Sequence, residues 1–318
     1  MAHASISPIW QVDILKKLTL ISLLVASTFA YGQTTDSVEL AKRVPIADVH
    51  MHVYQTSSPS YYKEQMKKNN VQWAGGVGDY QPSLAQDLGN RYISAIGQVE
   101  FLGQIGSGLE DTSRFSQLFD TAEQMFAAGT LKGFGEIHSD NHNSGPSHIH
   151  RQIRMKSPVI ERMYQIADKH KGFVQIHAEY NTQFESDLYY LSQTYPNAVT
   201  VLAHCLPKSN PRILDKLFTD LPNVVCEISG KNGPVHAGLF GKARMFDKEG
   251  VRPAWVNVIN KHPDRIMLGT DPCCGMDSQY SEMIDNMRTM FLPYFGTDVI
   301  EKIAYKNAVR LFKLDGAK

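Results

Sequence analysis

Histidine and carboxylate side chains recur at the ends of short apolar segments in this chain, and these residue types ligate divalent metal ions. The first such segment contains His50 and His52, two residues apart. Side chains alternate along a β-strand, so both imidazoles are expected on the same face, where they can chelate one ion. Alone, a His-x-His pair is a weak signal, because such pairs also occur by chance.

Later apolar segments end in the same residue types. Glu136 and His138 close one of them, and His177, His204 and Asp271 close three others. A carboxylate at such a position is costly to bury unless it is paired or bound to a metal ion. Each residue taken alone is equally well explained as a hydrogen-bonded core histidine or a helix-capping carboxylate, but together they predict a shared metal site. Its predicted ligands are His50, His52, Glu136, His177, His204 and Asp271.

The elements that must position these residues are strands that alternate with amphipathic helices. Such alternation predicts an α/β fold with a parallel sheet covered on both faces. Repeated units over roughly 270 residues match the size of a (β/α)8 TIM barrel, whose active sites lie at the C-terminal ends of the strands. The main alternative is an open doubly wound sheet, which is disfavoured because no Gly-x-Gly-x-x-Gly turn follows the first strand. The predicted strands are Ile46–Val53, Val71–Val77, Tyr92–Val99, Gly133–His138, Phe173–His177, Val199–His204, Val224–Ser229 and Arg265–Gly269, and the predicted helices include Pro158–His170, Gln183–Thr194, Pro211–Thr219 and Asp277–Phe291.

The first 32 residues have the composition of a secretory signal peptide. Lys16 and Lys17 precede the apolar run Leu18–Phe29, and the small residues Ala30 and Gly32 follow it. The run is well short of the ~20 residues that a membrane-spanning helix needs, so a cleaved leader is expected rather than stable membrane insertion. We therefore expect a signal peptide over 1–32, a linker over 33–43, a single catalytic domain over 44–318, and a periplasmic or secreted protein.

Overall composition is that of a soluble globular protein, with 42% hydrophobic and 20% charged residues. The 32 basic and 32 acidic residues cancel, so the charge does not suggest a nucleic-acid partner. Four cysteines allow three disulfide pairings that the sequence does not distinguish, and buried thiols are an equally good interpretation. They are Cys205, Cys226, Cys273 and Cys274.

Together these motifs resemble the amidohydrolase superfamily of metal-dependent barrels, most closely its amidohydrolase-related hydrolase branch, from residue 44 to the C-terminus. The resemblance implies that the ligands divide between two metal positions bridged by Glu136. In that arrangement His50, His52 and Asp271 hold the more buried ion, and His177 and His204 hold the outer one.

The bridging position leaves the number of ions open. Many phosphotriesterase-like members of the superfamily have a carboxylated lysine there, whereas deoxyribonuclease-like members have a glutamate, as this chain does at Glu136. Lys132 lies too far upstream to replace it. Single-metal members of the related branch use the first His pair, one later His and the Asp.

Zn²⁺ is the expected cofactor, as one or two ions, because imidazole and carboxylate ligands around an open position suit it. Metal-activated water is expected to attack an ester, lactone, amide or phosphoester, with Asp271 as the catalytic residue that accepts the water's proton. Two alternatives remain at this point. One is a non-oxidative decarboxylase of the same superfamily, and the other is a non-catalytic periplasmic zinc-binding protein that uses the His-rich segment 138–150.

Substrate contacts are expected from His138 and from the loops that follow the strands, at Tyr180, Lys231 and Arg154. The loop after the fourth strand also carries His148 and Arg151, and such a basic loop suits an anionic group. The expected partner is a small molecule. The sequence does not identify the substrate, and it leaves homo-oligomer formation open.

Overall fold

The computed structural model describes residues 33–53, 58–78, 80–97, 100–101, 112–143, 147, 150, 153–232, 234–236, 244–273 and 275–316. The predicted leader over 1–32 lies outside the described residues, as do His148, Arg151 and Cys274. Among the helices of the described part of the chain, none is long and apolar enough to span a membrane.

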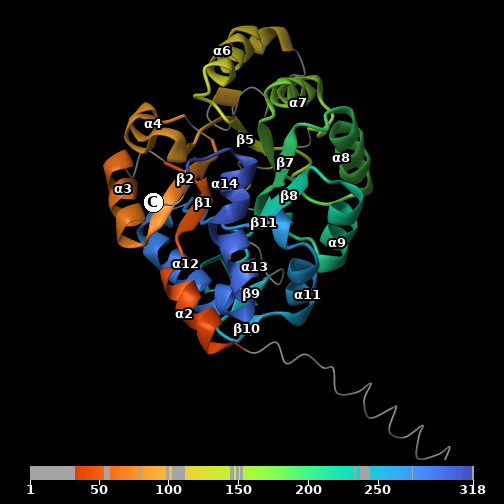
Figure 1. The fold of residues 1–318 in the computed structure, drawn as a ribbon. Helices are drawn as coiled ribbons and strands as arrows, with labels where there is room; N and C mark the ends of the chain where they lie inside the picture. The colour runs from red at the N-terminus through yellow and green to blue at the C-terminus, as the bar shows by residue number, and fades with distance from the viewer. Residues whose placement is uncertain are drawn as a thin grey trace, which may run out of the picture. The chain divides into compact units, whose positions relative to one another are not determined.

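Parallel strands follow one another around a TIM barrel, as predicted (Figure 1). One run of pairing links β1, β2 and β3, and a second links β4, β5, β6, β7, β8 and β11. The short strands β3 and β4 are separated only by Ser94, and they join the two runs. On the other side, Val49 N donates to Leu268 O (3.1 Å) and Asp271 N donates to His50 O (2.7 Å), which brings β1 and β11 together. The strands are β1 (Ile46–Met51), β2 (Val71–Gly76), β3 (Tyr92–Ile93), β4 (Ala95–Ile96), β5 (Gly133–His138), β6 (Phe173–His177), β7 (Val199–Leu202), β8 (Val224–Glu227) and β11 (Ile266–Met267).

The strands are short and almost entirely buried, which is why they read as apolar runs in the sequence. The bounds of β5 and β6 coincide with the prediction. Strand β7 is shorter than predicted, because the chain turns after Leu202 into the 3-10 turn Ala203–Cys205. His204 therefore lies in a turn and not at the end of a strand.

Helices cover the outer side of the strands, and α7, α8 and α9 flank β5, β7 and β8 in Figure 1. Several begin as their sequences predict: in α7, Ser157 Oγ accepts from Ile160 N and proline occupies the first turn. The helices are α2 (Thr35–Arg43), α3 (Pro59–Lys68), α4 (Pro82–Leu88), α6 (Ser116–Ala127), α7 (Pro158–His170), α8 (Thr182–Thr194), α9 (Pro211–Asp220), α11 (Pro253–Lys261), α12 (Tyr280–Asn286), α13 (Thr297–Glu301) and α14 (Asn307–Leu311). Two π-helical segments, Met287–Phe291 and Lys302–Lys306, continue α12 and α13.

The segment 33–43, expected as a linker, contains helix α2. Ser37 Oγ donates to Phe295 O (2.8 Å), and Arg288 Nη1 donates to Ala41 O (2.7 Å). These contacts dock α2 on the barrel, so the described chain is structured from its first residues onward.

Apolar side chains fill the interior of the barrel. One buried cluster takes residues from β1, β2, β3, β4, β6, β7, β8 and β11, and Phe312 and Leu314 of the C-terminal segment pack against it. Strand β5 has a glycine, Gly133, at this layer. A larger residue would not fit, because a Cβ there would lie 2.5 Å from the ring of Phe173. This filled layer leaves only the C-terminal ends of the strands open for chemistry.

An antiparallel hairpin after β8 is absent from the sequence prediction. Its strands are β9 (Phe246–Asp247) and β10 (Gly250–Val251). Asn232 bridges Phe246, which places the hairpin beside the segment that follows β8.

Candidate metal centre

Three predicted ligands converge on one point at the C-terminal end of the barrel. His50 Nε2 lies 3.2 Å from His52 Nε2. Asp271 Oδ1 lies 3.3 Å from His52 Nε2 and 3.6 Å from His50 Nε2. The imidazoles of His50 and His52 thus point to the same side, although the register between β1 and β2 shifts between Asp48 and Met51. We call these three residues the inner group.

A second set of ligands lies beside the first. His177 Nδ1 is 3.1 Å from His204 Nε2. Glu136 Oε1 lies 2.8 Å from His177 Nδ1 and 3.3 Å from His204 Nε2. His177 and His204 form the outer group, which faces one oxygen of Glu136.

The other oxygen of Glu136 faces the inner group. Glu136 Oε2 lies 3.8 Å from His50 Nε2 and 3.9 Å from His52 Nε2. The carboxylate therefore stands between the two groups and presents one oxygen to each. All six predicted ligands are buried and meet in one cluster, in which Asp271 is placed by its distances to His50 and His52.

Glu227 is a further carboxylate at the cluster, and the sequence did not predict it. Its Oε1 accepts from His204 N (2.7 Å) and lies 2.8 Å from His50 Nδ1, while its Oε2 accepts from Ser229 N (2.7 Å). Glu227 could itself form a metal site with His50 and His204. We assign it an orienting role instead, because it accepts from two backbone amides and lies against the nitrogens of His50 and His204 that point away from the other ligands. The signal was present, since Glu227 is a carboxylate at the end of an apolar strand, and Glu136 lies near the end of another.

Asp48 and Gly269 set the position of Asp271. Asp48 accepts from Thr270 N (2.9 Å) and from Thr270 Oγ1 (2.6 Å), which ties β1 to the residue before Asp271. A side chain at Gly269 would strike the carboxylate of Glu227 and approach His50 Cβ to 2.8 Å. Asp271 itself has a φ of 50°, and this turn of the backbone directs its carboxylate inward.

Electrostatics at the cluster favour bound positive charge. Burial opposes ionisation of Asp271 and Glu136, but the imidazoles around them hold both pKa values below their usual range. Burial also opposes a charge on His50, yet Glu227, Glu136 and Asp271 raise its pKa to about 10. His177 is different, because burial lowers its pKa to about 4 despite the presence of Glu136.

The donor set fits a divalent metal ion. Asp271 Oδ1 is buried and has no hydrogen-bond partner among the described residues, although it points at the inner imidazoles. An ionised carboxylate oxygen left in this way is costly unless a cation meets it. Imidazole nitrogens and carboxylate oxygens are the ligands that zinc takes in open sites. The cluster is therefore a metal-binding site.

The residues predicted to contact substrate lie in different environments. His138 Nε2 is buried 3.5 Å from Glu136 Oε2, at the edge of the cluster. Tyr180 Oη donates to Glu185 Oε2 (2.5 Å), and Arg154 donates through two nitrogens to Asp187 of α8. The roles of His138, Tyr180 and Arg154 toward substrate stay predictions.

Lys231 lies in a buried environment that the sequence did not predict. Its side chain is 0% exposed, and Nζ donates to Leu206 O (3.1 Å) and Pro207 O (2.7 Å). Burial lowers its pKa to about 7. The predicted contact of Lys231 with substrate has no support in this geometry, because the ammonium is directed at the protein backbone.

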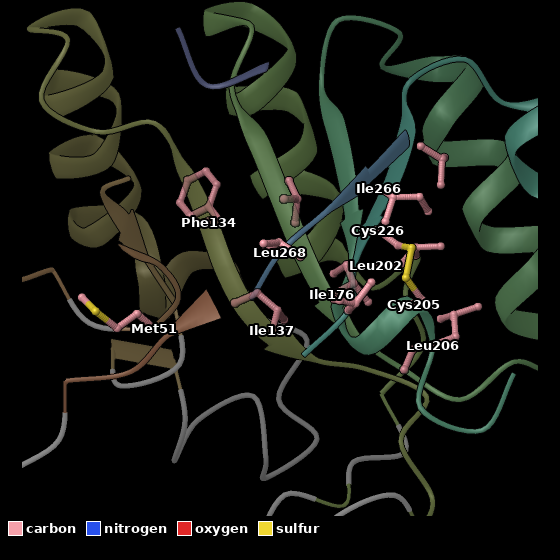
Figure 2. Close-up of a cluster of buried hydrophobic side chains, with 14 of the residues drawn as sticks. Met51, Phe134, Ile137, Ile176, Leu202, Cys205, Leu206, Cys226, Ile266 and Leu268 are labelled. Atoms are coloured by element: carbon pink, nitrogen blue, oxygen red, sulfur yellow. A yellow bond between two sulfur atoms is a disulfide. The ribbon is translucent and has the colours of Figure 1, made fainter. Parts of the chain in front are cut away.

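Of the cysteine pairings that the sequence left open, the structure contains Cys205–Cys226. The bond joins the turn after β7 to β8, among apolar side chains such as Leu202 and Leu206 (Figure 2). Both cysteines are fully buried.

Comparison with solved structures finds the same fold in three enzymes. A dihydroorotase from Saccharomyces cerevisiae has a TM-score of 0.53 at 11% identity, covering 86% of this chain and 85% of that one. A probable 2-pyrone-4,6-dicarboxylic acid hydrolase from Acinetobacter baumannii has a TM-score of 0.51 at 15% identity, with coverage of 85% and 99%. A 2,6-dihydroxybenzoate decarboxylase from Rhizobium has a TM-score of 0.50 at 12% identity, with coverage of 86% and 100%.

Sequence comparison gives the family. A search of curated proteins returns no significant match. The sequence model Amidohydro_2, described as amidohydrolase, matches residues 99–314, which is more than half of the chain. That span includes Glu136, His177, His204 and Asp271, and the structure adds His50 and His52 to the same cluster. The chain belongs to the amidohydrolase family.

Proposed function

We propose that this chain is an exported zinc-dependent hydrolase that cleaves an ester, lactone, amide or phosphoester with water. Amidohydrolase family members are mostly enzymes, and the ligand cluster retains the features that catalysis needs. The observation that carries the proposal is the position of Glu136, which presents separate oxygens to the inner and outer groups. This geometry supports two ions rather than one.

Asp271 is the residue best placed to move a proton. Its Oδ1 faces the inner imidazoles, and its Oδ2 lies 3.9 Å from His204 Nε2 in the outer group. The surrounding imidazoles hold the pKa of this carboxylate below its usual range, so it is ionised at neutral pH, as a proton acceptor must be. When bound, the metal supplies Lewis acidity and lowers the pKa of a coordinated water to about 7. Asp271 would take the proton of the attacking water and return it to the leaving group.

Glu227 and Asp48 keep this arrangement rigid. Glu227 fixes the ring of His50 and the backbone at His204. Asp48 holds Thr270 and therefore the residue that follows it. Preorganised groups of this kind avoid reorganisation during the reaction.

A substrate screen tests the reaction. We expect protein reconstituted with Zn²⁺ to hydrolyse at least one class among lactones, aryl esters, phosphotriesters and amides. Activity should disappear after chelation and return when Zn²⁺ is added back, because the ligands persist without the ion. Aromatic carboxylic acids belong in the same screen, since the Rhizobium structure with this fold is a decarboxylase.

Two outcomes contradict the proposal. Release of CO₂ from an aromatic acid, with no hydrolysis of any substrate, identifies a decarboxylase. Stoichiometric metal without turnover of any compound identifies a metal carrier.

Export is the second part of the proposal. The charged, apolar and small-residue order of residues 16–32 supports it. The buried disulfide supports it as well, because disulfides persist mainly in oxidising compartments. Cleavage before Gln33 also leaves Thr34 in place, whose side chain caps α2 by accepting from Ser37 N (3.1 Å).

We expect the mature protein to begin near Gln33 and to lie in the periplasm or the medium. N-terminal sequencing of protein purified from the native host measures this directly. A chain that retains Met1, or a protein confined to the cytosol, would show that the leader is not cleaved.

A further inference from the structure

The turn that carries His204 has an unfavourable backbone conformation. His204, Cys205 and Leu206 have φ values of 56°, 45° and 60°. Residues other than glycine rarely adopt this left-handed region, and a run of them persists only where the surrounding structure holds it. A metal ligand on such a turn depends on whatever fixes the turn.

Two tethers fix this turn to the end of β8. The disulfide joins Cys205, next to His204, to Cys226, next to Glu227. The ammonium of Lys231 donates to the two carbonyls that follow, those of Leu206 and Pro207. One tether is a covalent bond and the other is a pair of hydrogen bonds, and they act on adjacent residues of the same turn.

The hydrogen bonds of the ligand itself complete the attachment. His204 N donates to Glu227 Oε1 (2.7 Å), and His204 Nδ1 lies 2.9 Å from Ser229 Oγ. These contacts orient the ring so that Nε2 faces His177 and Glu136. They can form only when the turn lies against the end of β8.

We propose that the Cys205–Cys226 disulfide and the Lys231 ammonium are positioning groups for His204, which hold its imidazole at the outer metal position. We call the two tethers the clamp. The inference rests on the proposed two-ion centre. It assigns Lys231 a role in metal binding rather than in substrate binding, although its nitrogen touches no ligand residue.

The test removes each tether separately in the full-length mature protein. One variant replaces both cysteines (Cys205→Ala with Cys226→Ala), and the other is Lys231→Met, which keeps the length of the side chain but removes both hydrogen bonds. Val225→Ala is the matched control, because Val225 is a buried neighbour in β8 that packs in the barrel interior, away from the turn. Zn²⁺ affinity is measured by calorimetric titration, and Co²⁺ absorption reports on the coordination of each ion.

We expect each clamp variant to raise the dissociation constant of the outer ion by ~10-fold or more, the range seen when groups that orient ligands are lost. The inner ion should bind as in the wild type. Val225→Ala should lower the melting temperature without changing either dissociation constant. If the clamp variants bind both ions with wild-type affinity, the proposal is wrong.

A double-mutant cycle with His204→Ala decides whether the clamp acts through this ligand. Removing either tether should weaken binding when His204 is present and have no further effect in the His204→Ala background. Equal weakening in both backgrounds overturns the proposal and indicates a general loss of stability.

The same titrations separate this inference from the proposed function. A wild-type protein that takes up only one ion refutes the two-ion centre, and the cycle then reports on the affinity of that ion. If His204→Ala leaves that affinity unchanged, the clamp has no ligand to act through and the proposal fails. A positive cycle in a protein without hydrolase activity supports the clamp and refutes the hydrolase.

Discussion

Asp271→Asn is expected to lower the rate of hydrolysis by ~10²-fold or more while most of the metal stays bound. Asparagine keeps the size of the side chain and one oxygen, but its amide cannot accept a proton from water. Metal should be retained because His50, His52 and Glu136 still surround the inner position. Rate measurements on a confirmed substrate, beside metal content by atomic absorption, check both parts.

Asp48→Asn is the matched control for this variant. It makes the same chemical change in a neighbouring buried carboxylate, which accepts from Thr270 and from His50 N (3.2 Å) and so supports the ligands through the backbone. A smaller loss of turnover is expected, with a larger loss of thermal stability. Full activity in Asp271→Asn would show that the proton is accepted elsewhere.

Glu136→Gln is expected to reduce the bound metal from two ions to one and to abolish most of the activity. An amide offers one neutral oxygen, whereas the carboxylate presents a charged oxygen to each group of histidines. Without that charge, two dications in a buried site repel each other with little compensation. Zinc stoichiometry after dialysis and the hydrolysis rate are the two measurements.

Glu227→Gln is the matched control for Glu136→Gln. It separates the loss of a ligand that bridges two ions from a general loss of buried charge. It also removes an ionised carboxylate beside His50 and His204, but not one that stands between the two groups. We expect this variant to keep both ions, with affinity weakened ~10–100-fold as for other groups that orient metal ligands. If the two variants lose the same ion to the same extent, Glu136 is not a bridge.

Much of the barrel could be predicted because its strands are buried on both faces. Strands such as β5 and β6 are buried along their whole length and begin with apolar residues, and their ends carry the ligands. Convergence of those ends is a property of the fold, so Glu136, His177 and Asp271 could be grouped from the sequence alone.

What the sequence did not provide depends on contacts between distant segments. Lys231 was predicted to contact substrate because it follows a strand, yet a buried ammonium and an exposed one look identical in sequence. Glu227 was overlooked because its partners, His50 and His204, are brought to it only by folding. The short hairpin of β9 and β10 has too few residues for a periodic pattern, so it gave no signal.

The meeting of β1 and β11 has a consequence for the order in which the protein matures. Asp48 and Thr270 are bonded across 222 positions of sequence, and the inner ligands flank this contact. Contacts of such long range form late, because closing a large loop costs conformational entropy before the contact stabilises the chain. An emerging chain therefore carries the His50–His52 pair long before Asp271 exists to complete the chelate. We therefore expect the inner position to take up metal near the end of folding. With the proposed export, the compartment in which the barrel closes would then select the ion.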